Sequence, residues 1–227
     1  MTLNVIQKMP EREDMVGATH DFHDEEYAHL WAESFRVTKE RLECFEHIGD
    51  LLQSKLDGWS VILELGTGPG YLASYLLQRF KDISYHCVDY SDAMLNIAKE
   101  NLEEYSSRVT FQQIDLLEES WEKKIENKPV AIVSTWALHD LDNEEKIAEV
   151  YQSARKILLN NGILLNADFI KPEGIQDVFE NGRFPIINHQ EYLKNAGFSI
   201  VECTKMFEIN LVEPASHNNY ACFKGLV

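Results

Sequence analysis

A loop of three glycines is the feature of this sequence with the clearest chemical use. The segment Glu64-Leu-Gly-Thr-Gly-Pro-Gly70 follows a short apolar run and precedes a helical pattern. Glycines let the backbone turn sharply and approach a ligand closely, because no Cβ stands in the way. In an α/β sheet such a turn lies where nucleotide-like ligands bind, at the carboxyl ends of the strands. A tight strand-to-helix turn is the alternative interpretation of the glycines taken alone.

The glycine spacing distinguishes between kinds of ligand. It reads G-x-G-x-G, with Tyr71 at the position where a dinucleotide fingerprint has its third Gly or Ala. Bulk at that position fits poorly with a pyrophosphate on the helix N-terminus, and no Gly-Lys-Ser/Thr follows that would make a P-loop. The Glu64 carboxylate, which faces the loop, would repel a pyrophosphate but can bind a cationic or hydroxyl-bearing ligand.

Two further carboxylates follow the next two strand-like runs. Asp89 comes directly after residues 83–88, at a position where an acid can accept hydrogen bonds from both hydroxyls of a ribose. A helix cap or a solvated loop acid is the alternative for Asp89. Asp115 follows residues 109–114, where it can reach an adenine amino group or simply shape a turn.

These residues need a scaffold that brings several strand ends together. Strand-like runs alternate with helical patterns, which is typical of crossover units and of a doubly wound, mostly parallel sheet. The runs lie at residues 61–65, 83–88, 109–114, 130–134 and 163–166. Two last strand-like runs, at residues 198–203 and 220–223, have only a loop between them, so we expect them to pair antiparallel.

The segment ahead of this domain has a different pattern. Between residues 24 and 56, apolar side chains recur at spacings of three, four and seven, which predicts one or two amphipathic helices. We therefore divide the chain into an N-terminal helical extension or lid, residues 1–56, and a main domain, residues 57–227. Tyr27 and Trp31 lie four residues apart on one helical face, where they cover the pocket or pack in a core.

One helix boundary near the C-terminus can be predicted from a capping signal. Asn188 and Glu191 have the spacing of a capping box, in which the two side chains satisfy each other's exposed backbone N–H groups. This spacing predicts a helix that begins directly after Asn188.

Taken in order, these motifs resemble those of the class I S-adenosylmethionine-dependent methyltransferases. The glycine loop, Val88-Asp-Tyr-Ser-Asp-Ala-Met94 and Ile114-Asp115 are similar to the first three motifs of that family. Val133-Ser-Thr-Trp-Ala-Leu-His-Asp140 is similar to the fourth. Leu158-Leu-Asn-Asn-Gly-Ile-Leu-Leu-Asn-Ala-Asp168 resembles the fifth strand, with Asn in place of the first Gly. The resemblance extends from about residue 61 to the C-terminus.

The resemblance implies a seven-stranded sheet with an antiparallel last strand and a site for S-adenosyl-L-methionine. In that site Glu64 and the loop residues Gly66, Thr67, Gly68 and Gly70 lie beneath the methionine and ribose portions, and Asp89 binds the ribose. The other cofactor residues that it implies are Tyr90 and Met94 beside the adenine, Asp115 and Leu116 at its edge, and Ser134 and Thr135 near the transferable methyl.

Methyl transfer requires few catalytic groups from the protein. The sulfonium carries an activated methyl group, so the enzyme mainly aligns the nucleophile, and a base is needed only where the acceptor loses a proton. His139, after the fourth strand, is the best candidate base, since histidine titrates near neutrality; a structural or cofactor-covering role is the alternative. Trp136 lines the pocket or packs in the core, and Arg183 pairs with an acceptor carboxylate or forms a surface salt bridge.

Composition limits the partners. The 227 residues include 21 Lys and Arg against 38 Asp and Glu, a formal net charge of −17, which argues against nucleic-acid and anionic membrane partners. We expect a small-molecule acceptor that reacts through oxygen or nitrogen. The four cysteines are far apart and form no Cys/His cluster, so we expect no metal. Without a visible signal peptide or membrane span, we expect a cytoplasmic monomer or homodimer.

Two other classes of protein are compatible with parts of the pattern. The first is a nicotinamide-dependent oxidoreductase, against which the glycine spacing and the lack of a catalytic Tyr-x-x-x-Lys pair argue. The second is a non-catalytic cofactor-binding scaffold or regulatory protein of the same fold. The presence of Glu64, Asp89 and Asp115 together argues against lost cofactor binding.

Overall fold

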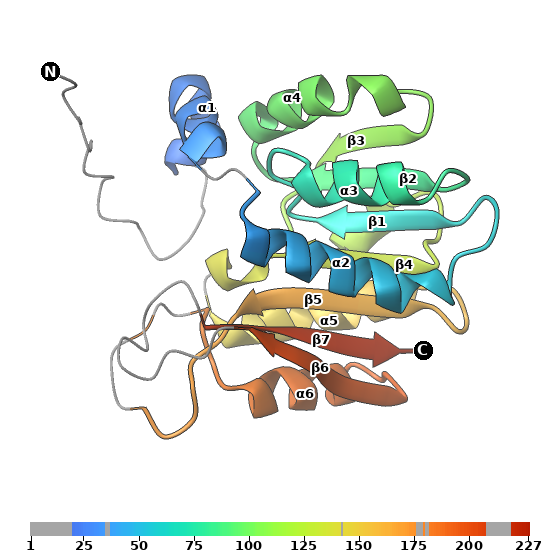
Figure 1. Cartoon of the computed structure of the whole chain (residues 1–227). Coiled ribbons are helices and arrows are strands. Elements are labelled where there is room, and N and C mark those ends of the chain that lie inside the picture. The colour runs from blue at the N-terminus through green and yellow to red at the C-terminus, as the bar shows by residue number, and fades with distance from the viewer. Residues whose placement is uncertain (1–19, 35–36, 142, 176–178, 180–181, 208–218) are drawn as a thin grey trace, which may run out of the picture.

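One sheet of seven strands organises the chain. The computed structural model describes residues 20–34, 37–141, 143–175, 179, 182–207 and 219–227. The strand order is β3-β2-β1-β4-β5-β7-β6, and only β7 runs against its neighbours β5 and β6 (Figure 1). The predicted doubly wound sheet with an antiparallel last strand is therefore confirmed. Its strands are β1 Val61–Leu65, β2 Ser84–Asp89, β3 Val109–Gln113, β4 Ala131–Thr135, β5 Ile163–Phe169, β6 Ile200–Phe207 and β7 Tyr220–Leu226.

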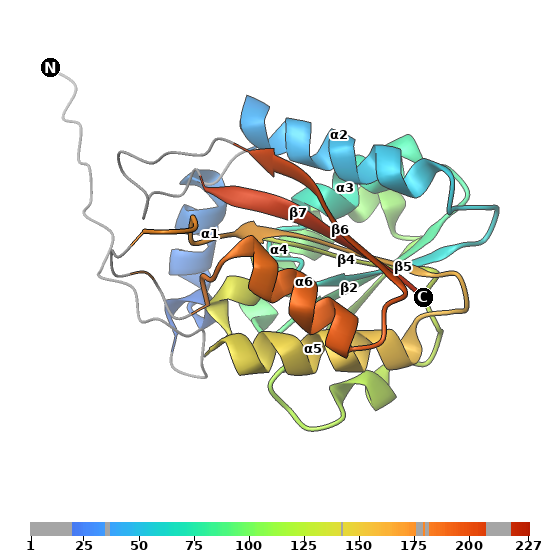
Figure 2. The same ribbon diagram turned by 90° about the horizontal axis from the view of Figure 1, so that it is seen from below.

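Helices cover both faces of this sheet. The helices α2 (Lys39–Gln53) and α3 (Tyr71–Arg79) pack on one face, and α5 (Glu144–Ile157) and α6 (Ile186–Asn195) on the other (Figure 2). The helix α4 (Asp92–Asn101) packs against β2 and β3. Because the central strands are buried on both sides, they appear in the sequence as continuous apolar runs rather than alternating ones.

Short 3₁₀ segments connect several of these elements. They are η1 (Asp21–His23), η2 (Glu103–Tyr105), η3 (Trp121–Lys124) and η4 (Leu138–Asp140). Two of them matter for the site described below, because η1 precedes the first helix and η4 follows β4.

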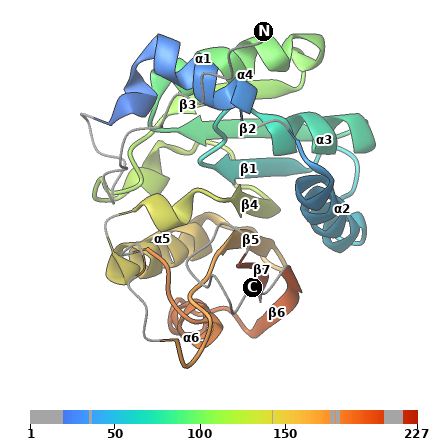
Figure 3. The same ribbon diagram turned by 60° about the vertical axis from the view of Figure 1, so that its left-hand side comes forward.

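The segment η1–α1 lies at the end of the sheet where the parallel strands finish. Helix α1 (Glu25–Ser34) stands there beside α4 (Figures 1 and 3). Its Ala28 and Ala32 are buried in a cluster with Ala93, Met94 and Ile97 of α4. These small side chains let the two helices approach closely.

Two hydrogen bonds attach this segment to the main domain. The Ser91 hydroxyl donates to the carbonyl oxygen of Phe22, and the Tyr71 hydroxyl donates to the carbonyl oxygen of Ala32 at 2.7 Å. The first bond joins η1 to the start of α4, and the second joins α1 to the start of α3. The N-terminal segment is thereby held over the strand ends by contacts at both of its ends.

The capping prediction at Asn188 was wrong. Helix α6 begins at Ile186, directly after Pro185, which has an extended backbone (φ −62°, ψ 155°). Proline is well tolerated at a helix start because its missing N–H would have no intrahelical acceptor there. The Asn188 side chain instead donates to Glu144 at 3.0 Å and so connects α6 to α5.

None of the helices in the described part of the chain is both long enough and apolar enough to cross a membrane.

The packing of α1 on α4 predicts which substitution would detach the N-terminal segment from the main domain. Ala28 has no exposed surface, so an Ala28→Leu substitution would overfill this contact at a cost of about 1–3 kcal/mol. Because α1 lies outside the two clusters that fill the sheet faces, we expect faster proteolytic cleavage within residues 20–34 and little change in the unfolding temperature of the main domain. His29→Leu, at the exposed neighbouring position, is the control. Equal cleavage rates for both variants and the unmodified protein would contradict this packing.

Candidate functional site

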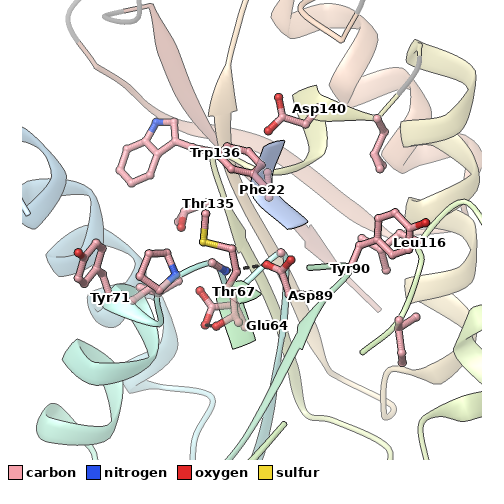
Figure 4. Close-up of a pocket in the computed structure, with 18 of the residues that line it drawn as sticks. Phe22, Glu64, Thr67, Tyr71, Asp89, Tyr90, Leu116, Thr135, Trp136 and Asp140 are labelled. Carbon is pink, nitrogen blue, oxygen red and sulfur yellow. Dashed lines mark hydrogen bonds between the residues drawn. The ribbon is translucent and has the colours of Figure 1, made fainter. Parts of the chain in front are cut away.

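A pocket opens at the carboxyl ends of β1, β2 and β4. In the sheet, β1 lies between β2 and β4, so the chain reverses its direction of winding at β1 and leaves a crevice above the strand ends. The empty space of this pocket, counted out to its open mouth, is about 1070 Å³. Residues from many elements and loops line it, including both N-terminal helices (Figure 4).

The glycine loop forms one wall of the pocket. The backbone N–H groups of Gly66 and Thr67 both donate to the carbonyl oxygen of Val88, at 2.8 and 3.0 Å, which ties the loop to the end of β2. Gly66 has φ +70°, and a Cβ on it would stand 2.3 Å from the Cβ of Ala137. Only glycine therefore allows the loops after β1 and β4 to meet.

Gly68 and Gly70 complete this wall. Gly68 has φ +49° and lines the pocket, and a Cβ there would meet no protein atom within 4 Å. It would therefore take up space in the pocket and not in the core. Gly70 does not line the pocket; it is the left-handed residue (φ 80°) at the start of α3, where it lies close to Ala98 and Leu102 of α4 and the loop after it.

Asp89 is held by the glycine loop and still faces the pocket. Its Oδ2 accepts from the backbone N–H of Gly68 at 2.7 Å, and its Oδ1 accepts from that of Ser91 at 2.9 Å (Figure 4). Burial raises the pKa of Asp89, while these donors act to lower it. Since a carboxylate offers about four acceptor positions, some remain for a ligand beside the backbone donors of Gly68, Ser91 and Tyr90.

Glu64 lies beneath the loop and is 1% exposed. Its Oε2 accepts from the hydroxyls of Thr67 at 2.8 Å and Tyr85 at 3.0 Å. Burial raises the pKa of Glu64 to about 8, although both hydroxyls act to lower it. At neutral pH this side chain is therefore mostly protonated in the folded protein, which differs from the expectation of a carboxylate that faces the ligand.

The wall beyond Asp89 is mainly apolar. Tyr90, Met94 and Leu116 line the pocket here, together with Ile114 and Leu117. Asp115 is also part of this wall, and its Oδ1 accepts from the backbone N–H of Leu117 at 2.8 Å. Asp115 thus shapes its own turn with one oxygen, and the other oxygen is not used in that turn.

Trp136 dominates the opposite side of the pocket. It has a left-handed backbone (φ +48°), which is costly for a bulky residue and is typical of functional sites. The guanidinium of Arg41 lies 5.2 Å from its ring centroid, and the Phe45 ring lies 6.1 Å away. Burial lowers the pKa of Arg41 to about 10, so the side chain keeps its charge at neutral pH. Among the described residues that line the pocket, Arg41 is the one cationic side chain.

His139 lies one layer behind the pocket. It is 3% exposed and is not among the pocket-lining residues, whereas its neighbour Asp140 is. The His139 Nδ1 lies 2.7 Å from Asp168 Oδ1, and its Nε2 lies 3.2 Å from Asp140 Oδ1. The imidazole therefore stands between a core carboxylate and a pocket carboxylate.

Most of the residues that the sequence nominated come together here. The lining includes the predicted residues Glu64, Gly66, Thr67, Gly68, Asp89, Tyr90, Met94, Asp115, Leu116, Thr135, Trp31 and Trp136. Besides Gly70 and His139, three others lie outside it. The Ser134 hydroxyl is buried and donates to the carbonyl oxygen of Leu65 at 2.8 Å. Tyr27 packs on Phe22, with ring centroids 5.9 Å apart, and Arg183 is buried with its guanidinium 4.5 Å from the centroid of the Phe169 ring.

Sequence reasoning missed several lining residues. Those with functional groups or aromatic rings are Phe22, Arg41, Phe45, Tyr71 and Asp140. The first three come from the N-terminal segments, whose pattern indicates helices but not which face meets the pocket. Asp140 follows His139 directly, so its place beside the fourth motif was the available signal. The described residues include no group of three or more His, Cys, Asp or Glu side chains suited to a metal ion.

Comparison with known proteins agrees with the fold and the motifs. Residues 62–162 match the family model described as a methyltransferase domain. A 71-residue stretch is 34% identical to the malonyl-[acyl-carrier protein] O-methyltransferase of Brevibacillus brevis, which covers 31% of this chain and 26% of that protein.

Two solved structures share the fold over most of the chain. The crystal structure of a putative O-methyltransferase from Nostoc punctiforme has a TM-score of 0.69 at 16% identity, and covers 95% of this chain and 63% of that one. The CurJ carbon methyltransferase has a TM-score of 0.68 at 15% identity, over 86% of this chain and 56% of that one. The chain thus spans less than two thirds of each of these proteins. The chain therefore shares the fold of these solved methyltransferases, and residues 62–162 match a methyltransferase-domain model.

The protonation of Glu64 predicts a pH-dependent stability. The pKa of an unfolded glutamate is about 4.3, so between that pH and the folded pKa near 8 the unfolded chain ionises first. Stability is then lost as the pH rises through this window. Glu64→Gln stays neutral at every pH. The difference between its unfolding temperature and that of the unmodified protein should therefore shift in favour of the variant from pH 5 to pH 8. The exposed Glu100→Gln serves as the control, and a constant difference across this range would contradict a protonated Glu64.

Proposed function

We propose that this chain transfers the methyl group of S-adenosyl-L-methionine to a small-molecule acceptor. The observation that carries the proposal is Asp89, a half-buried carboxylate that is fixed by the glycine loop with acceptor positions left toward the pocket. A ribose diol is the ligand group that suits such a carboxylate, because its two hydroxyls can donate side by side.

The rest of the pocket suits the other portions of this cofactor. Tyr90, Met94 and Leu116 offer apolar contacts for an adenine, and Asp115 can accept from its amino group. The neutral Glu64 and the glycine loop lie on the side where the methionine portion would pass. When bound, the cofactor would supply an activated methyl group on a sulfonium, and the protein residues would align an acceptor with it.

The acceptor would enter between Trp136 and the N-terminal segment. Phe22, Trp31 and Phe45 line the pocket on that side, so we propose that residues 1–56 act as a lid that shields the acceptor and cofactor from water. The enclosed, largely aromatic walls favour a small organic molecule over a polymer. We expected oxygen or nitrogen attack; the similarity to both O- and carbon methyltransferases adds carbon as a third possible attacking atom.

Cofactor binding can be tested through Asp89. Asp89→Asn removes the charge and one acceptor oxygen, so we expect S-adenosylhomocysteine, the demethylated product, to bind about 10- to 100-fold more weakly. Isothermal titration calorimetry measures this change, with the exposed Asp92→Asn as a control of equal charge change. Binding within twofold of the unmodified protein would mean that Asp89 does not hold the ribose.

Transfer itself can be tested with labelled methyl groups. Incubation of the protein with radiolabelled S-adenosyl-L-methionine and a panel of phenols, carboxylic acids, 1,3-dicarbonyl compounds and amines should label at least one compound. We expect the label in small organic products and not in added RNA, DNA or protein. Tight binding of S-adenosylhomocysteine without any transfer would instead support a non-catalytic cofactor-binding protein of the same fold.

A further inference from the structure

Asp140 is the pocket carboxyl that the cofactor-binding motifs leave unassigned. It belongs to η4, which follows β4, and its side chain is 17% exposed. In Figure 4 it lies on the same side of the pocket as Trp136, across from Glu64 and Asp89. This is the side where the acceptor is proposed to enter, so Asp140 is placed to meet the acceptor and not the cofactor's ribose.

A buried histidine and a second carboxylate stand directly behind Asp140. His139 Nε2 lies 3.2 Å from Asp140 Oδ1, and His139 Nδ1 lies 2.7 Å from Asp168 Oδ1. Asp168 Oδ2 also accepts from the backbone N–H of His139 at 3.1 Å, so the imidazole is held both through its ring and through its backbone. The Phe169 ring packs against its edge, with centroids 4.8 Å apart. Asp168, His139 and Asp140 thus form a chain of side chains from the core to the pocket; His139 and Asp168 are hydrogen-bonded, while His139 Nε2 and Asp140 are in contact at ion-pair distance without hydrogen-bond alignment.

The inner end of this chain is an anion. Burial acts to raise the pKa of Asp168, but His139 holds it below its usual value through charge and a hydrogen bond. Asp168 therefore remains ionised and favours a proton on the imidazole over a proton on itself. An imidazole between two carboxylates is well suited to take part in proton transfer at its pocket end.

We propose that Asp140 accepts the proton that a methyl acceptor loses, and that His139 and Asp168 are positioning residues that orient Asp140 and share this proton. The inference rests on the proposed methyl transfer. In that step a lone pair of the acceptor forms a bond to the methyl carbon. The carbon–sulfur bond breaks, and its electron pair stays on sulfur, which becomes a neutral thioether. The acceptor's proton passes to the Asp140 carboxylate and is later released to water.

This role narrows the class of acceptor. The reacting atom must carry a hydrogen that leaves during or before attack, as in a hydroxyl group or a carbon between two carbonyl groups. A tertiary amine or a thioether would release no proton and would gain nothing from Asp140. A proton-accepting Asp140 therefore favours acceptors that lose a proton, such as a hydroxyl group or a carbon acid, over tertiary amines and thioethers.

The other titratable groups near Asp168, His139 and Asp140 do not compete for this proton near neutral pH. Burial lowers the pKa of His189 to about 3, so this ring stays neutral, and burial raises the pKa of Tyr151 well above its ordinary value. Arg183 lies over the Phe169 ring, with its guanidinium 4.5 Å from the centroid, and carries a fixed positive charge. These groups therefore do not replace Asp140 as the proton acceptor.

The coupling within the chain can be measured without knowing the acceptor. In nuclear magnetic resonance titrations of the free protein, Asp140→Asn should lower the proton affinity of the His139 ring by at least about tenfold, because it removes a carboxylate at ion-pair distance. Asp115→Asn, an equal charge change in the same pocket, should leave the titration of His139 unchanged. An Asp140→Asn titration equal to that of the unmodified protein would overturn the proposal.

The proton-accepting role is tested with the best acceptor found in the panel. The maximal rate of the unmodified protein should fall toward low pH, because a protonated Asp140 cannot accept the acceptor's proton. Asp140→Asn should lower the rate at least 100-fold and remove this acid limb, while S-adenosylhomocysteine still binds within twofold. His139→Gln should lower the maximal rate and shift the limb with little effect on KM, and Asp140→Glu should restore part of the rate.

The outcomes separate this inference from the proposed function. An unchanged rate or an unchanged acid limb in Asp140→Asn would overturn the assignment of Asp140 while methyl transfer stands, as would a preference for tertiary amines. If no compound in the panel is methylated, the proposed function fails, and the His139 titration alone decides whether Asp140 and His139 are coupled.

Discussion

The hydrogen bond from the Gly68 backbone to Asp89 is the interaction on which the site depends. It joins the loop after β1 to the end of β2, and the bonds from Gly66 and Thr67 to Val88 strengthen the same connection. The loop can come this close because Gly66 and Gly68 have positive φ angles and no side chains. One bond thus fixes both the backbone wall of the pocket and the direction of the carboxylate that faces it. Substitution of either partner would disturb the other.

The carboxyl groups on the two sides of the pocket differ in their electrostatic surroundings. Glu64, which is buried beneath the loop, is mostly neutral at pH 7, because the cost of burying a charge exceeds the gain from the hydroxyls of Thr67 and Tyr85. Asp140, on the other side, stands in front of an imidazole that is itself paired with an ionised Asp168. Four carboxyl groups line the pocket, and they differ in burial and in the groups that surround them. Arg41 adds a positive charge next to Trp136, with its guanidinium over the ring of this strained residue.

The N-terminal helices complete a site that the sheet leaves open. Ala28 and Ala32 bring α1 close to α4, and bonds to Ser91 and Tyr71 hold the segment over the strand ends. Phe22 and Trp31 reach the pocket only because of this placement. The N-terminal segment thus closes the pocket on the side of Trp136, while the glycine loop and Asp89 form the opposite wall.

The sequence by itself determined the strands, the sheet class and the glycine loop that forms one wall of the pocket. Those features follow from local patterns: a strand buried on both faces must be a continuous apolar run, and a turn with positive φ angles needs the glycines at 66, 68 and 70. Tertiary structure alone decided the rest. Whether Glu64 is ionised depends on its burial, and Arg41 and Phe45 reach the pocket because α2 packs on the sheet face beside Trp136. His139 and Asp168 are 29 residues apart and meet only because β4 and β5 are neighbours with parallel ends. Helix α6 likewise begins at Ile186 because Pro185 and the contact of Asn188 with Glu144 outweigh a local capping signal. Such pairings depend on long-range packing, which no local spacing encodes.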